Sequence, residues 1–91
     1  MLMTLKTNLK LRKVGNKYML VDVSEFDTNI TTVHTFNESA AFVWCAAVEH
    51  GLDAAVLASM LCDEYEVDYH TAFADVHRLL HTWQQSGLII Q

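Results

Sequence analysis

Hydrophobic and polar residues alternate along residues 9–14, which is the pattern of a β-strand with one face turned toward a core. A Gly-Asn pair at positions 15–16 separates this run from residues 17–23, which again favour a strand. Glycine suits a two-residue turn with a positive φ at its first position, so the two runs predict a β-hairpin. Residues 30–36 are rich in β-branched and aromatic side chains and follow a short polar connector. They predict a third strand, antiparallel to the second.

After residue 36 the spacing of apolar residues changes from two to between three and four, which predicts helices. Asn37, Asp53 and Asp68 each precede such a segment, and their side chains can accept backbone N–H groups from a first helical turn. Gly51 and Gly87 follow the first and the third segment and are typical helix stops. The predicted helices cover about residues 38–50, 54–65 and 69–86.

Each predicted helix carries apolar positions at helical spacing, and we expect these to face the core. In the first helix they are Ala40, Val43, Trp44 and Ala47. In the second they are Val56, Leu57, Met60, Leu61 and Tyr65. In the third they are Tyr69, Phe73, Val76, Leu80 and Trp83. Residues 88–90 form a short apolar tail, which adds a strand fragment or packs on the core.

This order of elements predicts an α+β fold of the winged-helix-like class, with a three-stranded antiparallel sheet followed by three helices that pack on one face of it. A chain of 91 residues has room for one hydrophobic core, so we expect residues 1–91 to form a single domain. Residues 1–8 precede the first predicted strand, and we expect them to be a flexible N-terminal segment.

The composition is that of a small folded binding domain. The chain is 52% hydrophobic and 19% charged and lacks proline, which distinguishes it from disordered chains. Its size leaves little bulk for a deep catalytic cleft, so a binding module is favoured over an enzyme. Cys45 and Cys62 lie in predicted helices without Cys-x-x-Cys spacing, and we expect them to be buried thiols. We find no signal peptide and no membrane-spanning run, so we expect a cytoplasmic protein without a membrane partner.

Charge is distributed unevenly along the chain, whose net charge is −5. Residues 1–17 carry five basic residues and no acidic one, whereas residues 18–91 contain Arg78 and all eleven acidic residues. The acidic helices disfavour a nucleic-acid partner, because affinity for phosphate backbones rests on clustered Lys and Arg. A winged-helix nucleic-acid binder that uses the basic hairpin remains an alternative.

No residue pattern indicates catalysis, a metal or a cofactor, and we therefore expect a protein that is not an enzyme. The glycines stand at element boundaries rather than in a phosphate-binding loop. His70, His77 and His81 share one stripe of the third helix, and the spacing of the last two would let both reach one metal ion. No carboxylate joins them on that stripe, so we interpret it as a solvated margin beside the core.

The third predicted strand has an unusual composition for the edge of a sheet. Residues 30–36 contain no Lys, Pro, Asp or Glu, the residues that usually protect an edge from pairing with another chain. In a three-stranded meander this strand would offer unpaired backbone groups to an extended segment. Two alternatives stay open: the strand is central, or the tail at residues 88–90 covers it. A further alternative is a self-associating scaffold, a weak homodimer in which this strand or Phe42 pairs with a second copy.

Several short motifs, taken in order, resemble the PqqD family, whose members contribute to pyrroloquinoline quinone biosynthesis. They are Phe36-Asn-Glu-Ser-Ala40, Val43-Trp44, Gly51-Leu-Asp53, Leu57-Ala58, Tyr65-Glu-Val67, Asp75-Val76, Leu79-Leu80 and Gly87-Leu-Ile89. The resemblance covers about residues 9–90. One departure is Phe36, where the family usually has Leu, and another is the acidic body of the chain.

The resemblance implies a non-catalytic adaptor with no cofactor of its own. Such proteins bind the leader of a ribosomally made precursor peptide as an added strand and present it to a modifying enzyme, often a radical S-adenosylmethionine (SAM) protein. Carried to this chain, the leader would pair with the backbone of Thr31, Thr32, Val33, His34 and Thr35. The implied groove wall on the third helix is Tyr69, Phe73, Val76, His77 and Leu80. Taken singly, the apolar residues of this wall are more often core residues than binding residues.

Overall fold

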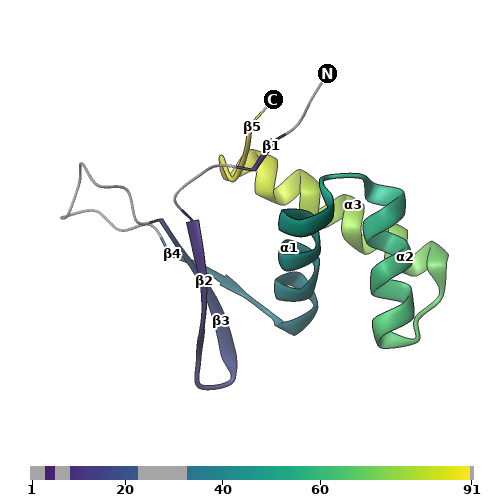
Figure 1. The fold of residues 1–91 in the computed structure, drawn as a ribbon, viewed down its shortest axis with the longest axis horizontal. Helices are drawn as coiled ribbons and strands as arrows, with labels where there is room; N and C mark the ends of the chain where they lie inside the picture. Colours follow the sequence, from purple (N-terminus) through teal and green to yellow (C-terminus); the bar gives the residue numbers. More distant parts are fainter. Residues whose placement is uncertain (1–3, 6–8, 23–32, 91) are drawn as a thin grey trace.

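The computed structural model describes residues 4–5, 9–22 and 33–90 and shows an α+β fold (Figure 1). Its antiparallel sheet consists of β2 (Leu9–Val14), β3 (Lys17–Asp22) and β4 (Val33–Phe36). The helices that follow are α1 (Glu38–His50), α2 (Ala54–Tyr65) and α3 (Tyr69–Gln85). The predicted order, a three-stranded antiparallel sheet followed by three helices, is thereby confirmed. None of the helices in the described ranges combines the length and apolarity that crossing a membrane requires.

The hairpin of β2 and β3 has the predicted two-residue turn. Val14 pairs with Lys17, and Gly15 has a φ of 65°, a value that glycine adopts without strain. Further along the hairpin, Leu11 pairs with Leu20, so both side chains lie on the same face of the sheet. Leu20 is completely buried. The alternation of residues 9–14 therefore directs the apolar face of the hairpin into the core.

Strand β4 lies at the edge of the three-stranded sheet, since the strand order is β2-β3-β4. Its partner is β3, with His34 opposite Leu20 and Phe36 opposite Tyr18. The C-terminal tail does not cover β4, because β5 (Ile89–Ile90) pairs instead with β1 (Thr4–Leu5) in a separate sheet. Residues 4–5 of the N-terminal segment that we expected to be flexible thus form a strand, and its other residues lie outside the described ranges.

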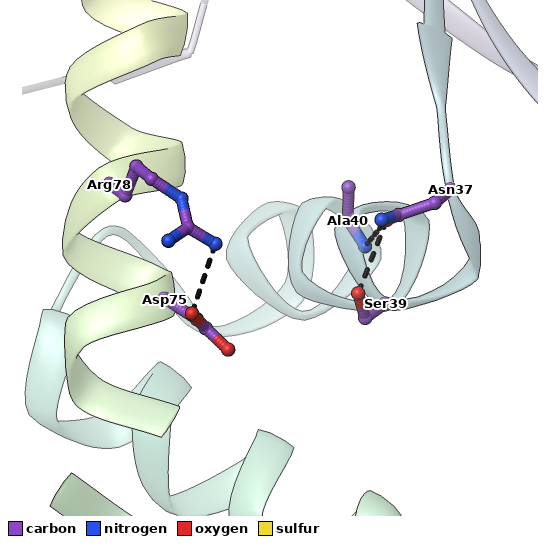
Figure 2. Close-up of polar contacts among 5 residues, drawn as sticks. All are labelled: Asn37, Ser39, Ala40, Asp75 and Arg78. Carbon is purple, nitrogen blue, oxygen red and sulfur yellow. Dashed lines mark hydrogen bonds and ion pairs between the residues drawn. The ribbon is translucent and has the colours of Figure 1, made fainter. Parts of the chain in front are cut away.

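The three helices begin at the predicted N-cap residues. The Asn37 side chain accepts the Ala40 N–H at 2.8 Å and the Ser39 hydroxyl at 3.2 Å, as Figure 2 shows. The carboxylates of Asp53 and Asp68 likewise accept N–H groups from the first turns of α2 and α3. These bonds satisfy backbone donors that have no partner within a helix, which explains why the local sequence sets the helix starts.

Replacing Asp53 with alanine is expected to lower the free energy of unfolding by about 1 kcal/mol, because two N–H groups of α2 lose their acceptor. Asp53→Asn is the matched control, since asparagine retains a side-chain oxygen at the cap and should cost much less. Urea unfolding followed by circular dichroism measures both variants. Equal losses in the two would contradict a role for the cap oxygen.

The core forms where α1 meets the sheet and α3. Phe36, Trp44 and Trp83 are all buried, and their ring centroids lie 5.2 to 5.9 Å apart. Helix α1 packs on β3 and β4, whereas α2 packs mainly on α3. All three helices were expected to stack on one sheet face. Helix α1 does so, α3 reaches the sheet through the stacking of Trp83 on Phe36, and α2 packs mainly on α3 (Figure 1). The physical reason is that α2 and α3 bury their apolar bands against each other.

Some predicted core positions are at the surface. Tyr69 and Phe73 at the start of α3 are 45% and 37% exposed, while Ala72 is completely buried. The small side chain of Ala72 turns inward in their place, so the buried stripe of α3 is rotated relative to the predicted band. The cysteine prediction was also wrong, because Cys45 is exposed and Cys62 is half-buried. Val56 of α2 is likewise exposed.

Candidate functional site

A groove with a volume of about 460 Å³ lies between β4 and the C-terminal half of α3. Its lining residues are His34, Thr35, Phe36, Asn37, Ala40, Leu79, Thr82, Trp83, Ser86 and Leu88. The first three belong to the edge strand β4. The open edge of the sheet and a concave surface are therefore contiguous.

The C-terminal end of α3 is positioned by its own stop signal. Gly87 adopts a positive φ of 79°, and the chain reverses so that the Leu88 N–H donates to the Trp83 carbonyl at 2.8 Å. Leu88 is 3% exposed and lies at the end of the groove. At the other wall, the Asn37 cap turns the chain from β4 directly into α1. The turn at Gly87 and the cap at Asn37 thus fix the two walls of the groove by local hydrogen bonds.

The groove has an aromatic floor and a hydroxyl-bearing rim. Phe36 and Trp83 stack at a centroid distance of 5.4 Å and are almost completely buried. Thr35, Thr82 and Ser86 are exposed around them. Such a surface suits an extended peptide whose backbone pairs with β4 while alternate side chains reach the floor.

Permanent charge is absent from the described lining of the groove, where His34 is the one titratable side chain. The groove therefore offers neither a fixed cation to an acidic ligand nor a fixed anion to a basic one. Recognition here depends on shape, apolar contact and backbone hydrogen bonds rather than on ion pairing.

The predicted strand residues are only partly described. His34 and Thr35 line the groove, and Val33 belongs to β4. Thr31 and Thr32 lie outside the described residues. The described residues of the strand predicted to pair with the leader therefore lie at the sheet edge, beside the groove.

The predicted helix wall lies elsewhere on α3. Val76 and Leu80 are buried in the core, at 0% and 8% exposed. Tyr69, Phe73 and His77 form an exposed row, with successive ring centroids 6.0 and 6.3 Å apart. None of the five lines the groove beside β4.

The groove instead uses the opposite flank of the same helix. At 100° per residue, Leu79, Thr82 and Ser86 share a face on one side of the buried stripe, and the row from Tyr69 to His77 lies on the other side. Sequence analysis did not single out these three residues, because they carry no distinctive chemistry. The one feature of the sequence that could have indicated them is that all three share a helix face beside the predicted core residue Trp83.

Possible metal ligands and the one cation of α3 were the other candidate features of the helices. Among the described residues, no group of three or more His, Cys, Asp or Glu side chains could hold a metal ion. On the exposed surface of α3, Arg78 forms an ion pair with Asp75 at 3.0 Å (Figure 2). A cation that is paired with a carboxylate is poorly suited to displace counterions from a nucleic acid.

A family model described as Coenzyme PQQ synthesis protein D (PqqD) matches residues 17–89. The resemblance that the motifs predicted is thereby confirmed. No curated protein sequence is significantly similar to the chain.

Two solved structures have similar folds. One is a lasso peptide synthetase B1 complexed with the leader peptide, with a TM-score of 0.74, 20% sequence identity and 98% of each chain covered. The other is TbiB1 in complex with the TbiA(beta) leader peptide, with a TM-score of 0.70 and 16% identity. It covers 94% of this chain and 93% of that chain. At these identities the likeness establishes the fold.

Proposed function

The chain belongs to the PqqD family, and we propose that it is a non-catalytic adaptor that binds the leader of a ribosomally made precursor peptide. The observation that carries the proposal is the groove beside the edge strand β4. An edge strand offers main-chain hydrogen bonds that a peptide of any sequence can form, and the adjacent groove selects among side chains. Two structures with the same fold are complexes with leader peptides, which supports the same role here.

In the proposed complex the leader adds an antiparallel strand to β4, with the backbone of residues 31–35 as the ladder. Alternate leader side chains then face the aromatic floor at Phe36 and Trp83. The groove favours Leu79, Thr82 and Ser86 as the helix wall, in place of the predicted wall of Tyr69, Phe73, Val76, His77 and Leu80. An interface of about eight peptide residues is smaller than a standard protein interface, so we expect roughly micromolar affinity.

An adaptor has to pass its cargo to an enzyme. We infer that the partner is a peptide-modifying enzyme and, as the PqqD family implies, a radical SAM protein. Co-elution of the two proteins with the leader in size-exclusion chromatography tests this pairing. A complex that forms only with another class of modifying enzyme would overturn the radical SAM assignment and leave the adaptor role standing.

Backbone methylation of the leader tests strand addition directly. In an added strand, successive peptide N–H groups point alternately toward β4 and away from it. A synthetic leader with one N-methyl group facing β4 is expected to bind at least tenfold more weakly, which is about 1.4 kcal/mol. The same peptide methylated at the neighbouring residue is the matched control and should retain its affinity. Isothermal titration calorimetry measures both peptides.

The difference in affinity between the two methylated peptides decides whether the leader binds as a strand. If both methylated peptides bind like the parent, the leader does not form a strand on β4. NMR titration of labelled protein gives a second criterion, because amide shifts are expected in residues 33–36. Shifts confined to α2 would reject the site.

A further inference from the structure

A second hollow, with a volume of about 270 Å³, lies between the hairpin, α1 and α2. Its lining includes Tyr18, Glu38, Phe42, Cys45, Glu64 and Tyr65, and we call it the aromatic hollow. It shares no residue with the groove beside β4. On α1, Ala40 lines the groove, whereas Glu38, Phe42 and Cys45 point away from it into the aromatic hollow. The two concave surfaces are therefore separated by α1.

Three aromatic side chains line the aromatic hollow. Phe42 and Tyr65 meet edge to face, with centroids 5.8 Å apart, and Tyr18 adds a third ring from the hairpin. Phe42 and Tyr65 are half-buried, so part of each ring remains accessible. Val48, three residues beyond Cys45 on α1, is 62% exposed.

Two carboxylates give this apolar surface a negative charge. Glu38 and Glu64 line the aromatic hollow from α1 and α2, and both side chains are exposed. Burial, followed by the charges of Glu38 and Glu64, raises the pKa of the Tyr65 phenol. Both carboxylates are thus close enough to influence the ring between them. Aromatic faces combined with carboxylates favour a cation over a neutral or an anionic group.

A cation already lies against one of these rings. The Lys13 ammonium is 5.8 Å from the centroid of Tyr18, which is within the range of a cation–π contact. Lys13 belongs to β2, one residue before its hairpin end, and its ammonium lies over the ring that the hairpin contributes. Phe42 and Tyr65, with Glu38 and Glu64, form the part of the aromatic hollow that lies on the helices.

We propose that the aromatic hollow receives an arginine side chain of a second protein, the enzyme that modifies the leader. Arginine fits better than lysine, because its planar guanidinium stacks on rings and binds carboxylates through paired hydrogen bonds. The position of the aromatic hollow on the far side of α1 from the groove lets enzyme and leader bind at the same time. The identity of the partner rests on the proposed adaptor function, whereas the preference of the hollow for arginine does not.

The preference is tested with N-acetyl-arginine amide as the probe and N-acetyl-citrulline amide as its neutral analogue of nearly the same shape. In NMR titrations of labelled protein, the arginine probe is expected to shift the amides of Phe42, Cys45 and Tyr65 saturably. The citrulline probe should bind roughly tenfold more weakly, because it lacks the charge. The double variant E38Q/E64Q should lose the difference between the probes while its leader affinity stays unchanged.

Three results would overturn the proposal. Equal binding of the two probes would exclude a cation site, and so would an unchanged preference in E38Q/E64Q. Concentration-dependent shifts at the aromatic hollow without any probe, abolished by Arg12→Gln, would assign it to a second copy of this chain. A failed arginine titration alongside normal leader binding would leave the adaptor function intact, so the two proposals are tested separately.

Discussion

Trp44→Ala is expected to lower the free energy of unfolding by about 3–5 kcal/mol, because the substitution leaves a large cavity in the core. Trp44 is 4% exposed, and its ring lies 5.9 Å from Phe36 and 5.2 Å from Trp83. These contacts join α1 to β4 and α3, so losing the ring weakens the junction of all three. A domain of this length is typically stable by about 5–14 kcal/mol, and the variant should lose a large share of that. Urea unfolding followed by circular dichroism measures the change.

The matched control is Tyr69→Ala, which removes an aromatic side chain that is 45% exposed. It should cost less than about 1 kcal/mol, because most of the lost contact is with solvent or with the exposed Phe73 ring. Neither Trp44 nor Tyr69 lines the groove or the aromatic hollow, so the comparison reports on packing alone. Similar losses in the two variants would contradict a core centred on Trp44.

Thr82→Trp is expected to weaken leader binding at least tenfold, or about 1.4 kcal/mol, by filling the groove beside β4. Thr82 is exposed on α3 and lines the groove, so a larger side chain there has solvent on one side and should not disturb the core. Titration calorimetry with the leader measures the affinity. A thermal melt confirms that the variant is folded.

His77→Trp is the matched control on the other flank of α3. It adds similar bulk to the exposed row with Phe73, at a residue outside the groove lining, and should leave leader affinity unchanged. The pair also separates two placements of the leader. If His77→Trp weakens binding and Thr82→Trp does not, the leader follows the row from Tyr69 to His77, and the groove is not its site.

Local chemistry accounts for the parts of the fold that sequence analysis predicted well. The turn at Gly15 and the caps at Asn37, Asp53 and Asp68 each depend on residues a few positions apart, so their signals are complete within a short stretch. The composition of residues 30–36 indicated an unprotected edge, but the sequence left a central or covered strand open, and the strand order β2-β3-β4 decides this for the described residues.

The predicted binding wall depended on information that is not local. Helical periodicity identified Val76, Leu80 and Trp83 as one buried stripe, and all three are buried. The buried stripe has a flank on each side, and helical spacing does not indicate which of the two flanks faces β4. The predicted wall, which includes Tyr69 and Phe73, followed from the resemblance to the PqqD family, and the periodicity of α3 gives no position relative to β4.

The amino-acid order by itself determined where each helix begins and how the hairpin turns, because those features arise from hydrogen bonds between near neighbours. Only the tertiary structure decided which flank of α3 faces β4. The stacking of Phe36 on Trp83 joins β4 to the C-terminal half of α3 and turns Leu79, Thr82 and Ser86 toward the groove. That contact spans 47 positions of the chain, and no periodicity within one helix encodes it.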